Sequence, residues 1–205
     1  MSERTIVTVS AGLGQPSSTR LLADRLSEAA VTELEARGVR VTVEAVELRD
    51  IAHEIVNNML TGFPTGELTG VLEKLTAADG LILVTPLFTT TYSGLFKSFI
   101  DIIDKDALTD MPVLLGATGG TPRHSLALEY SMRPLLTYLR ADVATTSVFA
   151  ATDDWAGEGD QVNPLPGRIR RAGRELAEMV AARENAGPAD LYDGVPSFDQ
   201  MLGNV

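Results

Sequence analysis

Length, composition and charge narrow the class of protein. The chain has 205 residues, enough for one well-packed domain, and its 44% hydrophobic and 5% aromatic content is ordinary for a soluble globular protein. Its net charge of -11 opposes binding to nucleic acid or to anionic membrane surfaces, so we expect no nucleic acid and no membrane as partner. The absence of cysteine excludes disulfides and thiolate chemistry and fits a reducing compartment, so we expect a cytoplasmic protein without a metal site.

Apolar, β-branched runs alternate with longer amphipathic stretches along the chain. This alternation is typical of βα repeats that fold into a parallel sheet with helices on both faces. The predicted strands are, in chain order, Thr5–Ser10, Val39–Ala45, Gly80–Thr85, Pro112–Ala117 and Ala144–Ala151. Most are continuous apolar runs, as expected for strands buried on both sides, but the second alternates apolar and polar residues and is therefore placed toward an edge.

The stretches between the strands predict helices. Their predicted positions are Leu22–Leu34, Leu68–Ala78, Gly94–Ile103, Ser125–Leu139 and Pro166–Glu184. Because proline removes a backbone donor, we expect a kink or a restart at Pro134. Residues 187–205 keep several aromatic and aliphatic side chains, so we expect this tail to dock on the domain of residues 1–186 or on a partner.

The loop after the first strand has the composition of a phosphate-binding site. Gly12 and Gly14 permit a tight turn, and three hydroxyl side chains then stand at a helix N-terminus, whose free N–H groups and positive dipole favour anions. Those hydroxyls, at Ser17, Ser18 and Thr19, are equally suited to plain helix capping. The loop also nearly matches a dinucleotide-binding fingerprint, but the acidic residue that this motif requires after the second strand is not at the expected distance.

The loops after the third and fourth strands have the composition of a binding site for a planar ring. In the first of them Pro86 restrains the backbone, while Leu87 and Phe88 offer apolar surface, for which ordinary core packing is the alternative interpretation. In the other, Gly119 and Gly120 permit close backbone approach to a ligand, for which a plain turn is the alternative. In the helix Gly94–Ile103, which follows the loop after the third strand, Lys97 and Asp101 are spaced for a structural ion pair.

Together and in this order, the three loops resemble those of the NAD(P)H-dependent FMN reductase family, whose corresponding segments read SxGxRxPSxT, TPxYxxxxSGxxK and TGG. The resemblance covers roughly residues 4–150. It implies a flavodoxin-like three-layer α/β sandwich with a five-stranded parallel sheet of order 2-1-3-4-5. It also implies hydride transfer from NADPH or NADH to N5 of FMN, with the cofactor providing the chemistry and no catalytic side chain.

The resemblance also implies which residues contact FMN. The phosphate would be held by Ser10, Ser17, Ser18 and Thr19, with Gln15 in the same loop, and the isoalloxazine by Pro86, Leu87, Phe88, Thr89, Thr118, Gly119 and Gly120. Many relatives place an arginine where this chain has Gly14 and Gln15, so Arg20, or neutral donors alone, would meet the phosphate charge. Weak retention of FMN suits a reductase that releases reduced flavin to a separate flavin-dependent monooxygenase, a role found among relatives.

Other functions remain open from the residues alone. An FMN enzyme of this kind could instead reduce quinones or azo compounds, the chain could be a flavodoxin-like electron carrier, or it could bind a nucleotide without redox chemistry. The apolar helix Gly94–Ile103 and the apolar residues of the tail leave surface that a monomer covers with difficulty. We therefore expect a homodimer or homotetramer.

Overall fold

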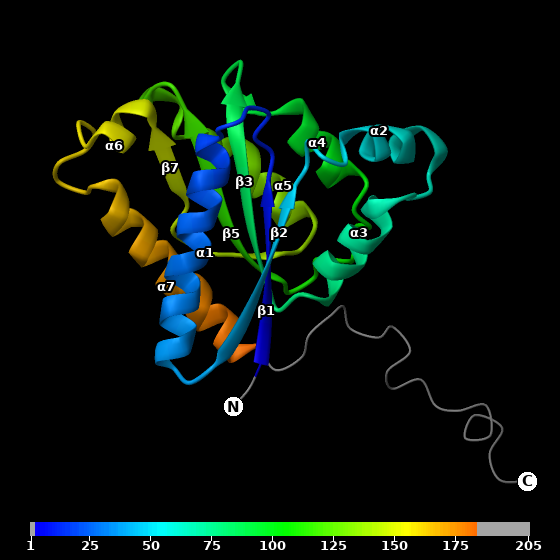
Figure 1. Cartoon of the computed structure of the whole chain (residues 1–205), viewed down its shortest axis with the longest axis horizontal. Coiled ribbons are helices and arrows are strands. Elements are labelled where there is room, and N and C mark those ends of the chain that lie inside the picture. Colours follow the sequence, from blue (N-terminus) through cyan, green and yellow to red (C-terminus); the bar gives the residue numbers. More distant parts are fainter. Residues whose placement is uncertain (1–2, 184–205) are drawn as a thin grey trace, which may run out of the picture.

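The strands form a mostly parallel sheet in the computed structural model, which describes residues 3–183 (Figure 1). They are β1 Glu3–Ser10, β2 Arg40–Glu47, β3 Gly80–Phe88, β4 Thr91–Tyr92, β5 Pro112–Gly119, β6 Asp142–Val143 and β7 Val148–Ala151. The order is β2-β1-β3-β5, and β5 pairs in parallel with both β6 and β7. The predicted order 2-1-3-4-5 is therefore confirmed, and the alternating strand β2 lies at an edge as expected.

The sheet has seven strands, not the predicted five. The short strand β4 is an addition, because β3 turns back on itself and pairs with it antiparallel. Of the predicted fifth strand, Ala144–Ala151, only the second half forms a strand, β7, and its first half lies in the gap between β7 and the short strand β6 that precedes it. There the Arg133 guanidinium donates to the carbonyls of Ala144 and Thr145, and a carboxylate oxygen of Glu175 accepts from the N–H of Thr146 at 2.7 Å. These side chains bind backbone groups that a continuous strand would use in its ladder.

The helices cover both faces of the sheet. They are α1 Ser18–Ala36, α2 Ala52–Thr61, α3 Glu67–Ala77, α4 Gly94–Asp101, α5 Arg133–Tyr138, α6 Thr152–Ala156 and α7 Leu165–Ala182. A π-helical turn at Leu128–Met132 precedes α5, and Pro134 lies in the first turn of α5, where its missing N–H costs little. This is the predicted restart. The predicted tail, residues 187–205, lies outside the described residues.

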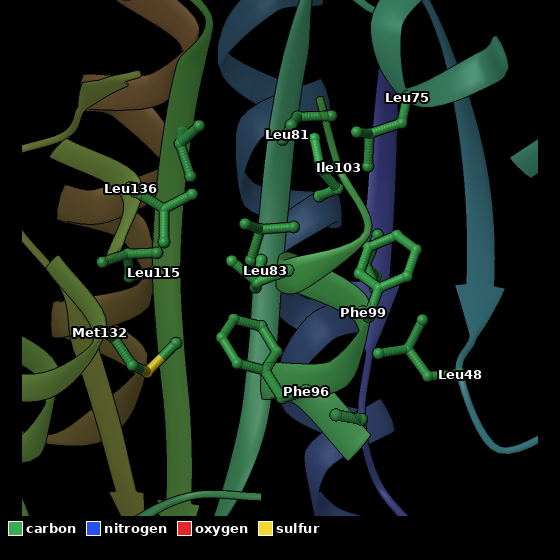
Figure 2. Close-up of a cluster of buried hydrophobic side chains, with 14 of the residues drawn as sticks. Leu48, Leu75, Leu81, Leu83, Phe96, Phe99, Ile103, Leu115, Met132 and Leu136 are labelled. Atoms are coloured by element: carbon green, nitrogen blue, oxygen red, sulfur yellow. The ribbon is translucent and has the colours of Figure 1, made fainter. Parts of the chain in front are cut away.

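The alternation of side chains along the strands divides the core in two. Ile6, Ile82 and Leu114 face α1 and α7, whereas their neighbours in the strands face α2, α3, α4 and α5. Figure 2 shows Phe96 and Phe99 of α4 over the second of these faces, near Leu83 of β3. Both faces are thus apolar and covered, so polar groups concentrate at the ends of the strands. Across residues 3–183, no helix is both long and apolar enough to cross a membrane.

Gly173 of α7 lies against α1 with almost no free space. A Cβ at this position would lie 2.6 Å from Cβ of Ala29 and 2.9 Å from the backbone nitrogen of Ala30. We therefore expect Gly173→Ala to lower the free energy of unfolding by about 1–3 kcal/mol, measured by chemical denaturation. The matched control is Gly167→Ala in the same helix.

The position of a Cβ on Gly167 has no described atom within 4 Å. Here we expect alanine to raise the free energy of unfolding by about 0.5–1 kcal/mol, because it reduces the conformational entropy of the unfolded chain. Equal effects of the two substitutions would contradict the close contact between α1 and α7.

Candidate functional site

A cavity of about 500 Å³ opens at the carboxyl ends of the parallel strands, where the strand order reverses between β1 and β3. It is lined by the carboxyl ends of strands and by the segments that follow them, from four different strands. These are Gly12, Leu13, Gly14, Pro16, Ser17, Ser18 and Thr19 after β1, Pro86, Leu87 and Phe88 on β3, Thr118, Gly119 and Gly120 on and after β5, and Ala150, Thr152 and Trp155 on and after β7. The three predicted loops therefore converge on one cavity.

Most of the predicted cofactor-binding residues line this cavity. They are Ser17, Ser18, Thr19, Pro86, Leu87, Phe88, Thr118, Gly119 and Gly120. Three predicted residues lie elsewhere. Ser10 is buried at the end of β1, Gln15 lines a smaller cavity on the other side of the first loop, and Thr89 is exposed in the turn between β3 and β4.

The N-terminus of α1 forms one end of the cavity. Ser17 is its N-cap, and its Oγ accepts a hydrogen bond from the N–H of Arg20 at 3.2 Å, so the capping interpretation of this residue is correct. Capping satisfies one N–H of the first turn. The N–H groups of Ser18 and Thr19 belong to the same turn and have no partner within the helix, which leaves them available to an anion.

The buried hydroxyl of Ser10 is a second group without a partner at this end. Thr8, two residues earlier on β1, points toward α1 and its Oγ1 lies 2.8 Å from Oγ of Ser27. Because side chains alternate along a strand, Ser10 faces the same way. Its Oγ is buried and has no hydrogen-bond partner within the described part of the chain. An unpaired buried hydroxyl beneath the first loop fits a site that a polar ligand or an ordered water completes.

A buried hydrogen bond joins the first loop to the third. Oγ1 of Thr19 lies 2.8 Å from Oγ1 of Thr118, and both residues are buried. The bond links the first turn of α1 to the end of β5, across the intervening strand β3. It therefore fixes the width of the cavity between its two polar walls.

The β3–β4 turn explains why Thr89 faces solvent. Thr89 and Thr90 have φ angles of 51° and 74° and connect the paired residues Phe88 and Thr91. Two positive φ angles are typical of a two-residue hairpin turn, although glycine or asparagine usually occupies it. Phe88 is 47% exposed beside this turn, whereas Leu87 packs partly against the core. The core-packing interpretation thus applies to Leu87, and both side chains also line the cavity.

Every residue that lines the cavity is uncharged. Arg20, one candidate for the phosphate charge, instead donates to Asp24 at 2.7 Å and Glu47 at 2.9 Å beyond the first loop. The hydrogen bond to Asp24 is the main factor that raises the pKa of Arg20. Arg49 lies on the same side and donates to the carbonyl of Gly14 at 2.8 Å, so it supports the loop from behind. An anion in the cavity is left to backbone and hydroxyl donors.

The lining residues on and after β7 were not among those predicted from the sequence. Ala150, Thr152 and Trp155 complete the lining, and so does Leu13 of the first loop. A signal for Thr152 and Trp155 was present. Since Ala144–Ala151 is predicted as a parallel strand of the same sheet, the segment that follows it must emerge at the same edge as the other loops.

The sheet order and the site together define a class. A parallel sheet of order β2-β1-β3-β5-β7, with a cavity at its carboxyl edge between the start of α1 and the end of β3, defines the flavodoxin-like class of proteins. Residues 4–156 match the family described as NADPH-dependent FMN reductase, and the chain belongs to this family. It is accordingly an oxidoreductase that acts with FMN and a reduced nicotinamide nucleotide.

Known proteins similar to this chain support the assignment. A curated FMN reductase (NADPH) from Pseudomonas aeruginosa is 35% identical over 87% of this chain and 93% of its own length. An oxidoreductase from Corynebacterium diphtheriae, solved by X-ray crystallography, is 44% identical with a TM-score of 0.85 and covers 89% of this chain and 100% of its own. The apo structure of the NADH:FMN oxidoreductase EmoB is 25% identical with a TM-score of 0.75, covering 98% of this chain and 100% of its own.

The Thr19–Thr118 bond provides a test of how the loops are held. Valine at either position leaves the remaining hydroxyl buried without its partner, so we expect each single variant to lose about 1–3 kcal/mol in the free energy of unfolding. The double variant Thr19→Val/Thr118→Val should lose less than the sum, because it leaves neither hydroxyl unpaired. Chemical denaturation of the four proteins measures this coupling.

Thr32→Val is the matched control on α1. The hydroxyl of Thr32 is exposed and donates to the carbonyl of Glu28 at 2.8 Å, so its loss should change stability by less than about 0.5 kcal/mol. Strictly additive losses at Thr19 and Thr118 would show that the two loops are not coupled.

Proposed function

We propose that this chain reduces FMN with NADH or NADPH in the cavity at the carboxyl edge of the sheet, and that reduced FMN leaves for a flavin-dependent monooxygenase. The observation that carries the proposal is the convergence of the three loops on one uncharged cavity with a helix N-terminus at one end and apolar surface on β3. FMN, when bound, supplies a tricyclic ring that accepts a hydride at N5. The chain's own residues bind FMN and orient it toward the nicotinamide donor.

The phosphate end is formed by neutral donors. The N–H groups of Ser18 and Thr19 and the hydroxyls of Ser17 and Ser18 lie at the first turn of α1, where the helix dipole favours negative charge. Ser10 offers its unpaired hydroxyl beneath them. A helix terminus contributes about 0.3–2 kcal/mol to anion binding, less than a buried pair of charges. Such a site supports reversible binding, as release to a monooxygenase requires.

The ring end combines apolar and amide surface. Pro86, Leu87 and Phe88 form an apolar wall, and the segment Thr118–Gly120 provides backbone groups directly beside it, because Pro86 and Thr118 are paired in the sheet. We expect N–H groups of this segment to stabilise the negative charge that a reduced flavin carries on its carbonyl edge. The exposed ring of Phe88 leaves apolar surface at the mouth for the nicotinamide donor. No side chain is assigned a proton-transfer role.

Assembly into a homodimer or homotetramer belongs to the same proposal. The reason differs from the one drawn from the sequence, which was the apolar surface of the helix Gly94–Ile103. Phe96, Phe99 and Ile100 of α4 are buried in the protein's own core, so this helix leaves little apolar surface uncovered. Exposed apolar side chains gather instead in a stripe on and after α2, where Val56, Met59 and Leu60 follow helical spacing and Phe63 comes just after the helix. This stripe supports contact between copies of the chain. The proposal also places the protein in the cytoplasm, where reduced nicotinamide nucleotides are available.

Gly120 is the informative position for testing FMN binding. A Cβ at Gly119 would lie 2.9 Å from Cζ of Phe149, so a substitution there disturbs the fold, whereas one at Gly120 has no described atom within 4 Å. We expect Gly120→Val to keep the melting temperature and to raise the Kd for FMN at least about tenfold, because the new side chain occupies the cavity wall. Flavin fluorescence titration and thermal melting measure the two quantities.

Thr89→Val is the control for this experiment, since Thr89 lies outside the cavity lining and should leave FMN affinity unchanged. Steady-state oxidation of NADH and of NADPH, with free FMN and with quinones as acceptors, should show the faster turnover with FMN. Unchanged affinity and turnover in Gly120→Val would contradict the proposed site.

The stripe on α2 provides a test of assembly. Leu60 and Phe63 are 81% and 74% exposed, and a carboxylate at either position would be desolvated in an interface. We expect Leu60→Glu/Phe63→Glu to reduce the mass measured by light scattering after gel filtration. Val162→Glu, at an isolated valine that is 96% exposed, should leave the mass unchanged. A monomeric parent protein would contradict the proposed assembly.

A further inference from the structure

Trp155 forms the wall of the cavity at its β7 end. It lies in the short helix α6, directly after β7, and lines the cavity with Ala150 and Thr152. It is the only tryptophan of the chain. The same ring packs against the buried cluster between the sheet and the helices α1 and α7. One part of the indole is therefore held by the core while another bounds the cavity.

Arg25 holds the indole from the side of α1. Its Cζ lies 5.5 Å from the centroid of the Trp155 ring, within the range of a cation–π contact. Arg25 follows Ser18 by seven positions, so both lie on the same side of α1 about two turns apart. The indole therefore flanks the first turns of α1, which form the phosphate end of the cavity. Arg25 itself lines a separate groove with Glu28 and Arg170, not the cavity.

The opposite side of the phosphate end is bounded by the first loop. This loop is tightly folded, because a Cβ on Gly12 would lie 2.2 Å from Oγ of Ser17. The phosphate end thus lies between a packed loop and a held indole. FMN ends at its phosphate, whereas FAD continues from this phosphate through a second phosphate to an adenosine. At about 500 Å³, the cavity is in the lower half of the usual range of roughly 300–1,000 Å³ for small-molecule sites.

We propose that Trp155, positioned by Arg25, is the residue that restricts this site to flavin mononucleotide and excludes FAD. The inference rests on the proposed function, since the position of the phosphate sets where a longer flavin would continue. To leave past the indole, the second phosphate and the adenosine would have to displace a ring packed on the core. Before they reached Arg25 beyond the indole, they would also pass over a cavity lining that offers no cation to a second phosphate.

The test compares the affinities of two flavins in three proteins. Flavin fluorescence titrations give the Kd for FMN and for FAD, without turnover, in the parent chain, in Trp155→Ala and in Trp155→Phe. We expect the parent to prefer FMN by on the order of tenfold or more, and Trp155→Ala to reduce this preference to within about threefold, mainly through tighter binding of FAD. Trp155→Phe keeps an aromatic wall and should keep most of the preference.

A second variant covers the case in which Trp155→Ala does not fold. Arg25→Met keeps an unbranched side chain on α1 but removes the cation above the indole, so it should loosen the ring and reduce the preference in the same direction by about threefold. An unchanged ratio of the two Kd values in Trp155→Ala, or equal affinities in the parent, would overturn the inference while the proposed function stands. Binding of neither flavin by the parent would overturn the proposed function itself, and this inference with it.

Discussion

The packing of α1 against the sheet and against α7 beside it is the constraint on which the cavity depends. Leu22, Leu26 and Leu34 are buried on one side of this helix, and the missing side chain of Gly173 lets α7 approach it closely. The bond between Thr8 and Ser27 then fixes α1 along β1. Because the helix is held along its length, its first turn stays at the carboxyl edge of the sheet, where its free N–H groups face the cavity.

The distribution of charge around the cavity makes the position of the first turn of α1 decisive for anion binding. The chain carries 17 lysines and arginines, yet every residue of the cavity lining is uncharged. Arg20 and Arg49 approach the first loop only from behind, where Glu47 lies 2.9 Å from one guanidinium and 2.7 Å from the other. A guanidinium paired with a carboxylate exerts little net field on a third group. In the proposed site, the attraction for a phosphate therefore comes from the end of α1 and from hydroxyls, on a molecule whose net charge of -11 repels anions at long range.

Local patterns predicted the features that local residues determine. Continuous apolar runs and the alternation in β2 fix which strands are buried, and parallel strands necessarily bring their loops to one edge. The interruption before β7 was not predictable in this way, because it depends on Arg133 and on Glu175, which is 29 residues from its backbone partner Thr146. The outward position of Thr89 depends on positive φ angles for which a run of threonines gives no local signal. Gln15 lines a different cavity from the other predicted residues for a similar reason, since composition does not specify the direction of a turn.

A site that attracts its ligand weakly by charge obtains its selectivity from shape, and the two apolar walls of this cavity are held by opposite halves of the core. Leu87 packs against the cluster beneath α4, whereas Trp155 packs against the cluster beneath α1 and α7. The sheet lies between these clusters, so the separation of the walls follows from its thickness and from the Thr19–Thr118 bond, and much less from the conformations of exposed loops. Changes in either core should consequently alter which flavin fits before they alter the donors at the phosphate end.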